Sequence, residues 1–111
     1  MNHFDKKIGK IIDELTTYLL KKNCNNIDIS IKKSEEEVHL IFNFDFICSK
    51  LIDMLEETLS QERDESMEEY GWELLGENDC SGELNLIGMC IDDLNVEIDG
   101  NHARIELIRK L

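Results

Sequence analysis

Cationic side chains are scarce in this sequence. Its 12 Lys and Arg face 25 Asp and Glu, so the formal net charge is −13 over 111 residues. A charge of this sign repels phosphate backbones and anionic lipid headgroups. We therefore expect no direct contact with nucleic acid or with a membrane surface.

Long apolar runs are missing as well. No stretch has the roughly 20 apolar residues that a bilayer-spanning helix needs. The opening residues, MNHFDKK, lack the apolar stretch of a secretory signal. Both observations predict a protein that stays in the cytoplasm.

Metal-binding and redox motifs are lacking too. There is no Cys-x-x-Cys pair, and the histidines do not have the helical i, i+4 spacing of metal ligands. We expect no metal and no cofactor. The cysteines are expected to be reduced and to pack as small hydrophobes, except for the third, which falls in a predicted exposed loop. They are Cys24, Cys48, Cys80 and Cys90.

What the sequence does contain is a regular apolar pattern, typical of a single folded domain over residues 1–111. Apolar positions recur every three or four residues from Phe4 to Leu19, which predicts a helix over about residues 3–22. Lys21 and Lys22, followed by an Asn, are typical of a helix C-terminus.

Two segments alternate apolar and polar residues instead. Residues 27–31 and 38–44 predict a β-hairpin around a polar turn. Residues 94–98 and 103–107 predict a second hairpin, whose tight turn contains Gly100.

Between the hairpins, helical spacing returns over 46–59, continues to about Leu75, and marks a further helix over 84–94. The predicted order is therefore α-β-β-α-α-α-β-β. We expect an α+β two-layer sandwich with a mixed four-stranded sheet that helices cover on one face. Within this middle part, residues 53–83 carry twelve Asp or Glu against Arg63 alone, a net charge of −11.

This order resembles the histidine-kinase-type (GHKL) ATPases, and most closely the small anti-sigma-factor serine kinases. Residues 83–101, ELNLIGMCIDDLNVEIDGN, look like the Gly-Leu-Gly-Leu helix, the following Val-Asp-Glu and the closing hairpin of that family. Residues 13–18, DELTTY, resemble its Glu-Leu-x-x-Asn helix. The resemblance implies an ATPase-like scaffold, with 53–83 as an acidic helical insertion in place of the ATP lid.

The residues that would carry the chemistry of the family are changed. Tyr18 stands where the family has the Asn that holds Mg²⁺. Residues 43–47, NFDFI, bring bulky residues in place of the glycine of the adenine-contacting turn. The phosphate-binding Gly-x-Gly has become Glu83, Leu84 and Asn85. Glu14 would be the catalytic base of an active member. Without a metal ligand beside it, we expect Glu14 to be a solvated or helix-pairing residue.

An acidic run with interleaved aromatics is the most unusual stretch. It is either a solvated helix whose aromatics pack on the core, or an acidic lid that binds a basic protein surface, with aromatic anchors and charge steering. The candidate contact residues are Glu65, Glu68, Glu69, Tyr70, Trp72 and Glu73.

Three functions remain open on these grounds. The leading hypothesis is a non-catalytic regulatory or adaptor domain that acts by protein–protein contact on a degenerate ATPase-like scaffold. The alternatives are an atypical nucleotide-binding serine kinase of the anti-sigma type, and an acidic nucleic-acid mimic or inhibitor. We also expect a possible homodimer, because an open sheet leaves an edge to protect.

Overall fold

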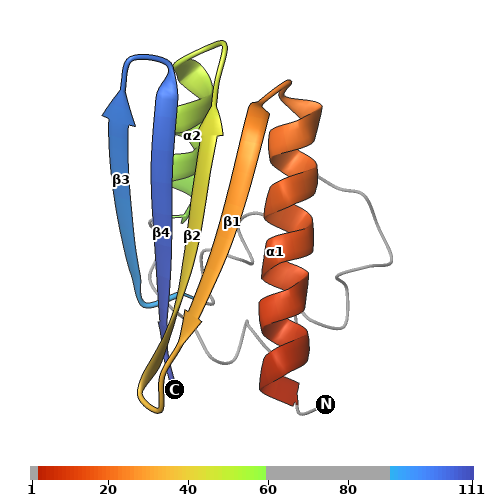
Figure 1. Ribbon diagram of the computed structural model, residues 1–111, viewed down its shortest axis with the longest axis vertical. Helices are drawn as coiled ribbons and strands as arrows, with labels where there is room; N and C mark the ends of the chain where they lie inside the picture. Colours follow the sequence, from red (N-terminus) through yellow and green to blue (C-terminus); the bar gives the residue numbers. More distant parts are fainter. Residues whose placement is uncertain (1–2, 60–90) are drawn as a thin grey trace.

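The computed structural model describes residues 3–59 and 91–111, with side chains from Lys6 onward in the first range. Within these ranges the chain forms two helices and a four-stranded sheet (Figure 1). The elements are α1 (His3–Lys21), β1 (Asn25–Lys33), β2 (Glu37–Asp45), α2 (Lys50–Leu59), β3 (Asp93–Asp99) and β4 (His102–Lys110).

The sheet joins two hairpins through their second strands. Its order is β1-β2-β4-β3, and every neighbouring pair is antiparallel. Strands β2 and β4 pair along their whole lengths, from Glu37 opposite Lys110 to Asp45 opposite His102. Because β2 and β4 are central, β1 and β3 are the two edges of the sheet.

Helix α1 ends at a left-handed Asn, as its sequence indicates. Asn23 has φ 62°, and its N–H donates to the carbonyl of Leu20 at 3.1 Å. The N–H of Cys24 donates to the carbonyl of Leu19 at 3.0 Å. This pair of bonds is the Schellman arrangement, which satisfies the last carbonyls of the helix and turns the chain into β1.

Each hairpin turn has a local cause. In the first, the Ser34 hydroxyl accepts from the N–H groups of Glu36 and Glu37, at 3.3 and 3.2 Å, and so closes the turn. In the second, Gly100 has φ 63°, a conformation that a residue without Cβ adopts freely.

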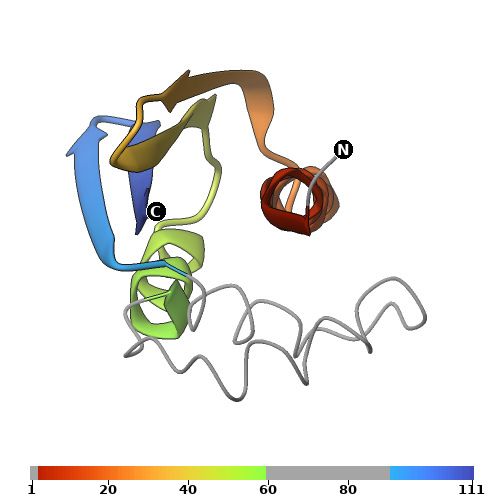
Figure 2. The same cartoon turned by 90° about the horizontal axis from the view of Figure 1, so that it is seen from below.

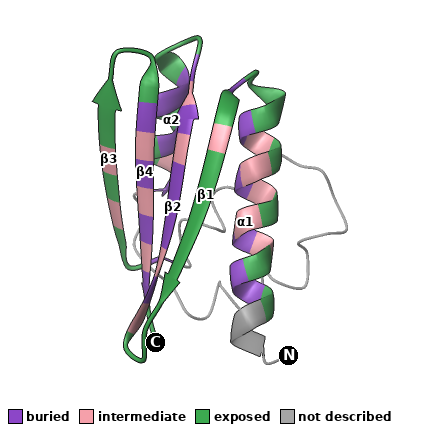
Figure 3. Cartoon of the chain, viewed as in Figure 1, coloured by how far each residue is buried: buried purple, intermediate pink, exposed green. Residues whose placement is uncertain are grey.

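One face of the sheet supplies the core. Along β2 and β4, alternate side chains are buried while their neighbours are partly exposed (Figure 3). The buried apolar residues on this side of β2 and β4 belong to one apolar cluster with residues of α1 and α2. Figure 2 shows α2 beneath the curved sheet and α1 beside β1. The largest fully buried side chains are Phe42, Phe44, Ile11, Leu15, Leu19, Leu40, Ile52, Leu55, Leu59, Ile105 and Leu107.

Among the residues that the structure describes, two cations are buried as well. Lys7 and Arg109 are each 6% exposed, and both are engaged by other groups. A buried charge requires such engagement, because removing it from water costs several kcal/mol, on the order of the stability of a domain.

The predicted α+β class and both hairpins are confirmed, but the prediction of a mixed sheet is wrong. The hairpins fix the strand directions within each pair, and β2 joins β4 antiparallel, so no parallel pair arises. The predicted third helix lies outside the described residues, as does the fourth up to residue 90. The predicted full order of elements and the helical layer therefore stay predictions.

Two helix boundaries also differ from the sequence-based prediction. The second helix begins at Lys50 rather than near Phe46, because the N–H of Phe46 donates to the carbonyl of Asn101 at 2.8 Å and keeps the chain extended. The fourth helix cannot reach Leu94, because β3 begins at Asp93.

The cysteines that the structure describes differ in exposure. Cys24 is buried, and burial raises the pKa of its thiol, whereas Cys48 is exposed rather than packed. Cys80 and Cys90 lie outside the described residues. No helix in the described part of the chain is long and apolar enough to cross a membrane.

The core placement makes a stability prediction. Leu107, in the centre of β4, is 1% exposed, so Leu107→Ala should lower the free energy of unfolding by on the order of 2–5 kcal/mol. The matched control is Leu20→Ala, the same change at a side chain that is 59% exposed, with little expected effect. Urea unfolding measures both. A loss below about 1 kcal/mol for Leu107→Ala would contradict the packing of β4.

Candidate functional site

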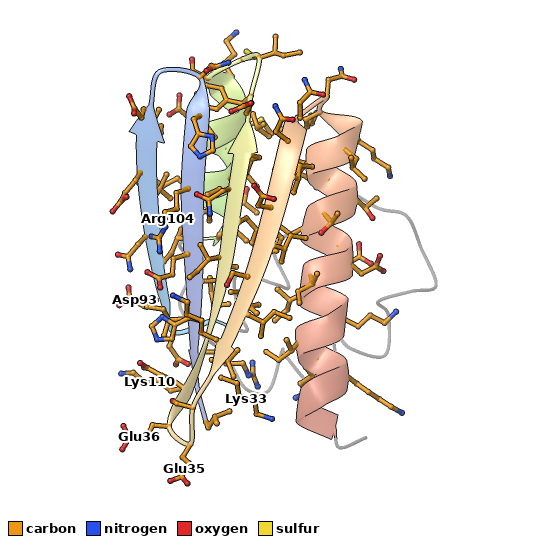
Figure 4. The ribbon with its side chains drawn as sticks, in the orientation of Figure 1. Lys33, Glu35, Glu36, Asp93, Arg104 and Lys110 are labelled. Atoms are coloured by element: carbon orange, nitrogen blue, oxygen red, sulfur yellow. The ribbon has the colours of Figure 1, made fainter. Side chains whose placement is uncertain are left out.

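The face of the sheet opposite the core is polar, and we call it the polar face. Strand register defines it, because directly paired residues project to the same side. From β1 it carries Asp28, Ser30 and Lys32. From each other strand it carries every second residue: Glu37 to Asp45 in β2, Asp93 to Asp99 in β3, and His102 to Lys110 in β4. Figure 4 labels Asp93, Arg104 and Lys110 among them.

Carboxylates dominate the polar face. Its basic side chains are Lys32, Arg104 and Lys110, with two histidines in addition. The carboxylates are more numerous, and those of Asp28 and of all three β3 acids belong to exposed residues. Their full set is Asp28, Glu37, Asp45, Asp93, Glu97, Asp99 and Glu106.

A histidine between two glutamates occupies one end of the polar face. Nδ1 of His39 lies 2.8 Å from a carboxylate oxygen of Glu106, and Nε2 lies 2.8 Å from one of Glu37. A neutral imidazole has a single N–H, so only the protonated ring can donate to both carboxylates. The bond to Glu106, followed by the bond to Glu37, therefore raises the pKa of His39.

Glu106 is the most connected carboxylate of this group. Besides His39, it accepts from the amide of Asn95 at 3.3 Å, and the guanidinium of Arg104 lies 4.0 Å away. The bond from His39 is the main reason why the pKa of Glu106 is lowered. Beside it, Ile41 is only 5% exposed, so the polar layer also covers an apolar side chain.

The other end of the face is organised around Asp45. Its two carboxylate oxygens accept from the amide of Asn26 at 2.8 Å and contact Nδ1 of His102 at 2.9 Å. The bond from Asn26 contributes most to the lowered pKa of Asp45, and His102 adds to it. Asn26 reaches this position at a register shift in β1, where its φ is 53°.

The carboxylates of the polar face are all exposed or half-buried. Within residues 3–59 and 91–111, no group of three or more His, Cys, Asp or Glu could hold a metal ion. The carboxylates of the polar face already accept several hydrogen bonds or remain exposed. An exposed layer of this kind presents a negative field to a partner.

Of the three stretches that resemble nucleotide-binding motifs, the structure describes residues 13–18 and 43–47, whereas residues 83–85 lie outside the described residues. Tyr18 is half-buried against the core, and burial, with a smaller effect of Cys24, raises the pKa of its hydroxyl. Phe44 and Phe46 are 0% and 8% exposed, and between them Asp45 projects to the polar face. Glu14 is half-buried on α1 and is engaged by another group.

The sequence-based contact residues are not among the residues that the structure describes. Glu65, Glu68, Glu69, Tyr70, Trp72 and Glu73 all fall in 60–90. The grouping of Glu37, His39 and Glu106 was missed by sequence reasoning. Alternation along β2 places the first two on one face, but only the register with β4 adds Glu106.

Comparison with known proteins adds no relative: the chain matches no protein-family model, no curated protein and no solved structure.

The geometry around His39 makes a prediction about pH. A raised His pKa stabilises the fold below pH 6.5, an effect lost as pH rises through the raised value. A lowered Glu pKa stabilises it above pH 4.5, an effect lost as pH falls through the lowered value. The ion pair therefore stabilises the fold fully between pH 4.5 and pH 6.5. Glu106→Gln should lower the pKa of His39 and cost most stability in this window.

NMR titration of the His39 ring and urea unfolding at several pH values measure these effects. The matched control is Glu57→Gln, which removes an exposed carboxylate from α2 and should leave the His39 titration unchanged. An unchanged His39 pKa in Glu106→Gln would mean that the bond is not made in solution.

Proposed function

We propose that this chain is a non-catalytic regulatory or adaptor domain that acts in the cytoplasm by contact with a protein that has a basic surface. We further propose that its scaffold is a degenerate form of the histidine-kinase-type ATPase domain. In that scaffold the two additional helices of the predicted order would fall between α2 and β3, and helices would cover the apolar face of the sheet.

The observation that carries the proposal is where the side chains at positions 18 and 43–47 lie. In an active member of the family, these positions would hold the metal and contact adenine. Here Tyr18, Phe44 and Phe46 pack in or against the core. Ile47 is 75% exposed, and Asp45 bonds to Asn26 and His102 on the opposite face. A nucleotide would have to displace Phe44 and Phe46, which are buried apolar side chains. This favours the adaptor over the atypical kinase.

The negative charge of this chain supports the proposal that its partner has a basic surface. The exposed carboxylates of β3 form one part of the acidic surface, and the acidic segment 53–83 adds the largest share of the negative charge in the sequence. Fields of this kind steer association with an oppositely charged protein and raise its rate. Because the charge is on the surface, the effect should weaken with salt.

The non-catalytic part of the proposal predicts weak nucleotide binding. Titration calorimetry with ATP and Mg²⁺ should give no saturable binding tighter than about 1 mM, because Tyr18 supplies no metal ligand of the required kind. Saturable binding in the micromolar range would favour the atypical kinase instead.

The contact part of the proposal predicts charge-dependent capture. Affinity capture from lysate should retain a basic protein at about 50 mM salt and lose it near 500 mM, as the Debye length shrinks to about 4 Å. Neutralising the β3 acids (Asp93→Asn, Glu97→Gln, Asp99→Asn) should weaken capture, and so should a second variant with Glu65, Glu68, Glu69 and Glu73 changed to Gln.

A matched control removes charge from outside both regions, through Asp13→Asn in α1 and Glu35→Gln in the first hairpin turn, both exposed. This control should keep the captured protein. Equal yields from wild type and both test variants would show that the acids serve solubility alone.

A further inference from the structure

The first strand of the sheet is an exposed edge with an apolar side. No residue of β1 is fully buried, and only Ile27 is half-buried (Figure 3). Ile29 and Ile31 project to the same side as Phe42 and Leu40, yet they remain 39% and 53% exposed. An edge strand also presents unpaired backbone N–H and C=O groups.

We propose that β1 pairs antiparallel with β1 of a second copy of this chain, about a two-fold axis beside Ser30. The two sheets then form one continuous sheet in which the apolar rows of both copies lie on the same side. This inference is independent of the proposed function.

The sequence of β1 is self-complementary in this register. On the apolar side, Ile29 lies opposite Ile31 of the second copy, and Ile31 opposite Ile29. On the polar side, Asp28 lies opposite Lys32 of the second copy, and Lys32 opposite Asp28. Both kinds of cross-strand pair stabilise antiparallel strands, whereas like charges in these positions destabilise them.

Neighbouring registers lose this match. Centring the axis on Ile29 leaves Asp28 opposite Ser30, and centring it on Ile31 leaves Lys32 opposite Ser30. The register is therefore set by charge, while backbone pairing and apolar contact supply attraction in all three.

The opposite edge of the sheet is protected against the same kind of pairing. If β3 paired with its own copy about Val96, Asp93 would lie opposite Asp99 of the second copy. If it paired about Glu97, the two copies of Glu97 would lie opposite each other. Pairing about Asn95 sets Asp93 against Glu97. Each register opposes carboxylates, a known device against edge association. The two edges thus differ in chemistry although both expose apolar side chains.

The molar mass of the protein in solution is the first test of the pairing. Light scattering on the full chain at about 100 µM should give a dimer. Ile31→Lys should give a monomer, because it places a cation in the apolar row. The matched control is Ile98→Lys, the same change on β3 at the same exposed fraction, 53%, and it should remain dimeric. Both sites are exposed, so neither change should unfold the domain.

Charge reversal then tests the register. Asp28→Lys and Lys32→Asp should each raise the dissociation constant about tenfold or more, because each converts two attractive pairs into repulsive ones. An equimolar mixture of these two variants should recover tight pairing as a heterodimer. The double variant should recover it as a homodimer.

Three results would overturn the proposal. A wild-type monomer at this concentration means that another partner, or none, uses the edge. If the Ile31→Lys variant is still a dimer, the dimer uses another surface. The same conclusion follows if charge reversal leaves the dissociation constant unchanged. Growth beyond a dimer with rising concentration would indicate head-to-tail pairing of β1 with β3 instead.

Discussion

The pairing of β2 with β4 is the constraint on which the rest of the structure depends. These strands come from two hairpins far apart in the chain, and their register sets which side chains share a face. Phe42 beside Ile105 and Leu40 beside Leu107 gather the apolar residues on one side. A shift by one residue would turn that entire set toward water. The same register places His39 and Glu106 close enough to bond on the other side.

Much of the fold follows from local sequence signals. The period of three and four predicts α1, alternation predicts all four strands, and Asn23 and Gly100 mark a helix end and a turn by their tolerance of positive φ. How the hairpins join could not be predicted in this way. Local patterns carry no information on whether two distant strands run parallel, so the expected mixed sheet was wrong.

The candidate site was less predictable than the fold, for a related reason. Asp45 lies within the stretch 43–47 that resembles a nucleotide motif, but its bonds to Asn26 and His102 depend on partners 19 and 57 residues away in the chain. Alternation predicts that β1 has an exposed face. It does not predict that the apolar row itself stays exposed, since this depends on which neighbours cover the strand.

These features together describe a domain whose core holds Phe44 and Phe46 and whose two sheet edges differ in charge. The acids of β3 lie at one edge of the polar face, and the self-complementary β1 forms the other. A dimer through β1 would leave both copies of the β3 surface available. Such a molecule can present its acidic surface twice, which strengthens attachment to a partner with repeated basic sites.

The central claim is that the polar face makes the functional contact. Carbodiimide labelling of carboxylates, with and without the captured basic protein, tests it most directly. The account predicts that Asp93, Glu97 and Asp99 lose reactivity in the complex, while the exposed Asp13 on α1 stays reactive. Protection of Asp13 with unchanged labelling of the three β3 acids would contradict it.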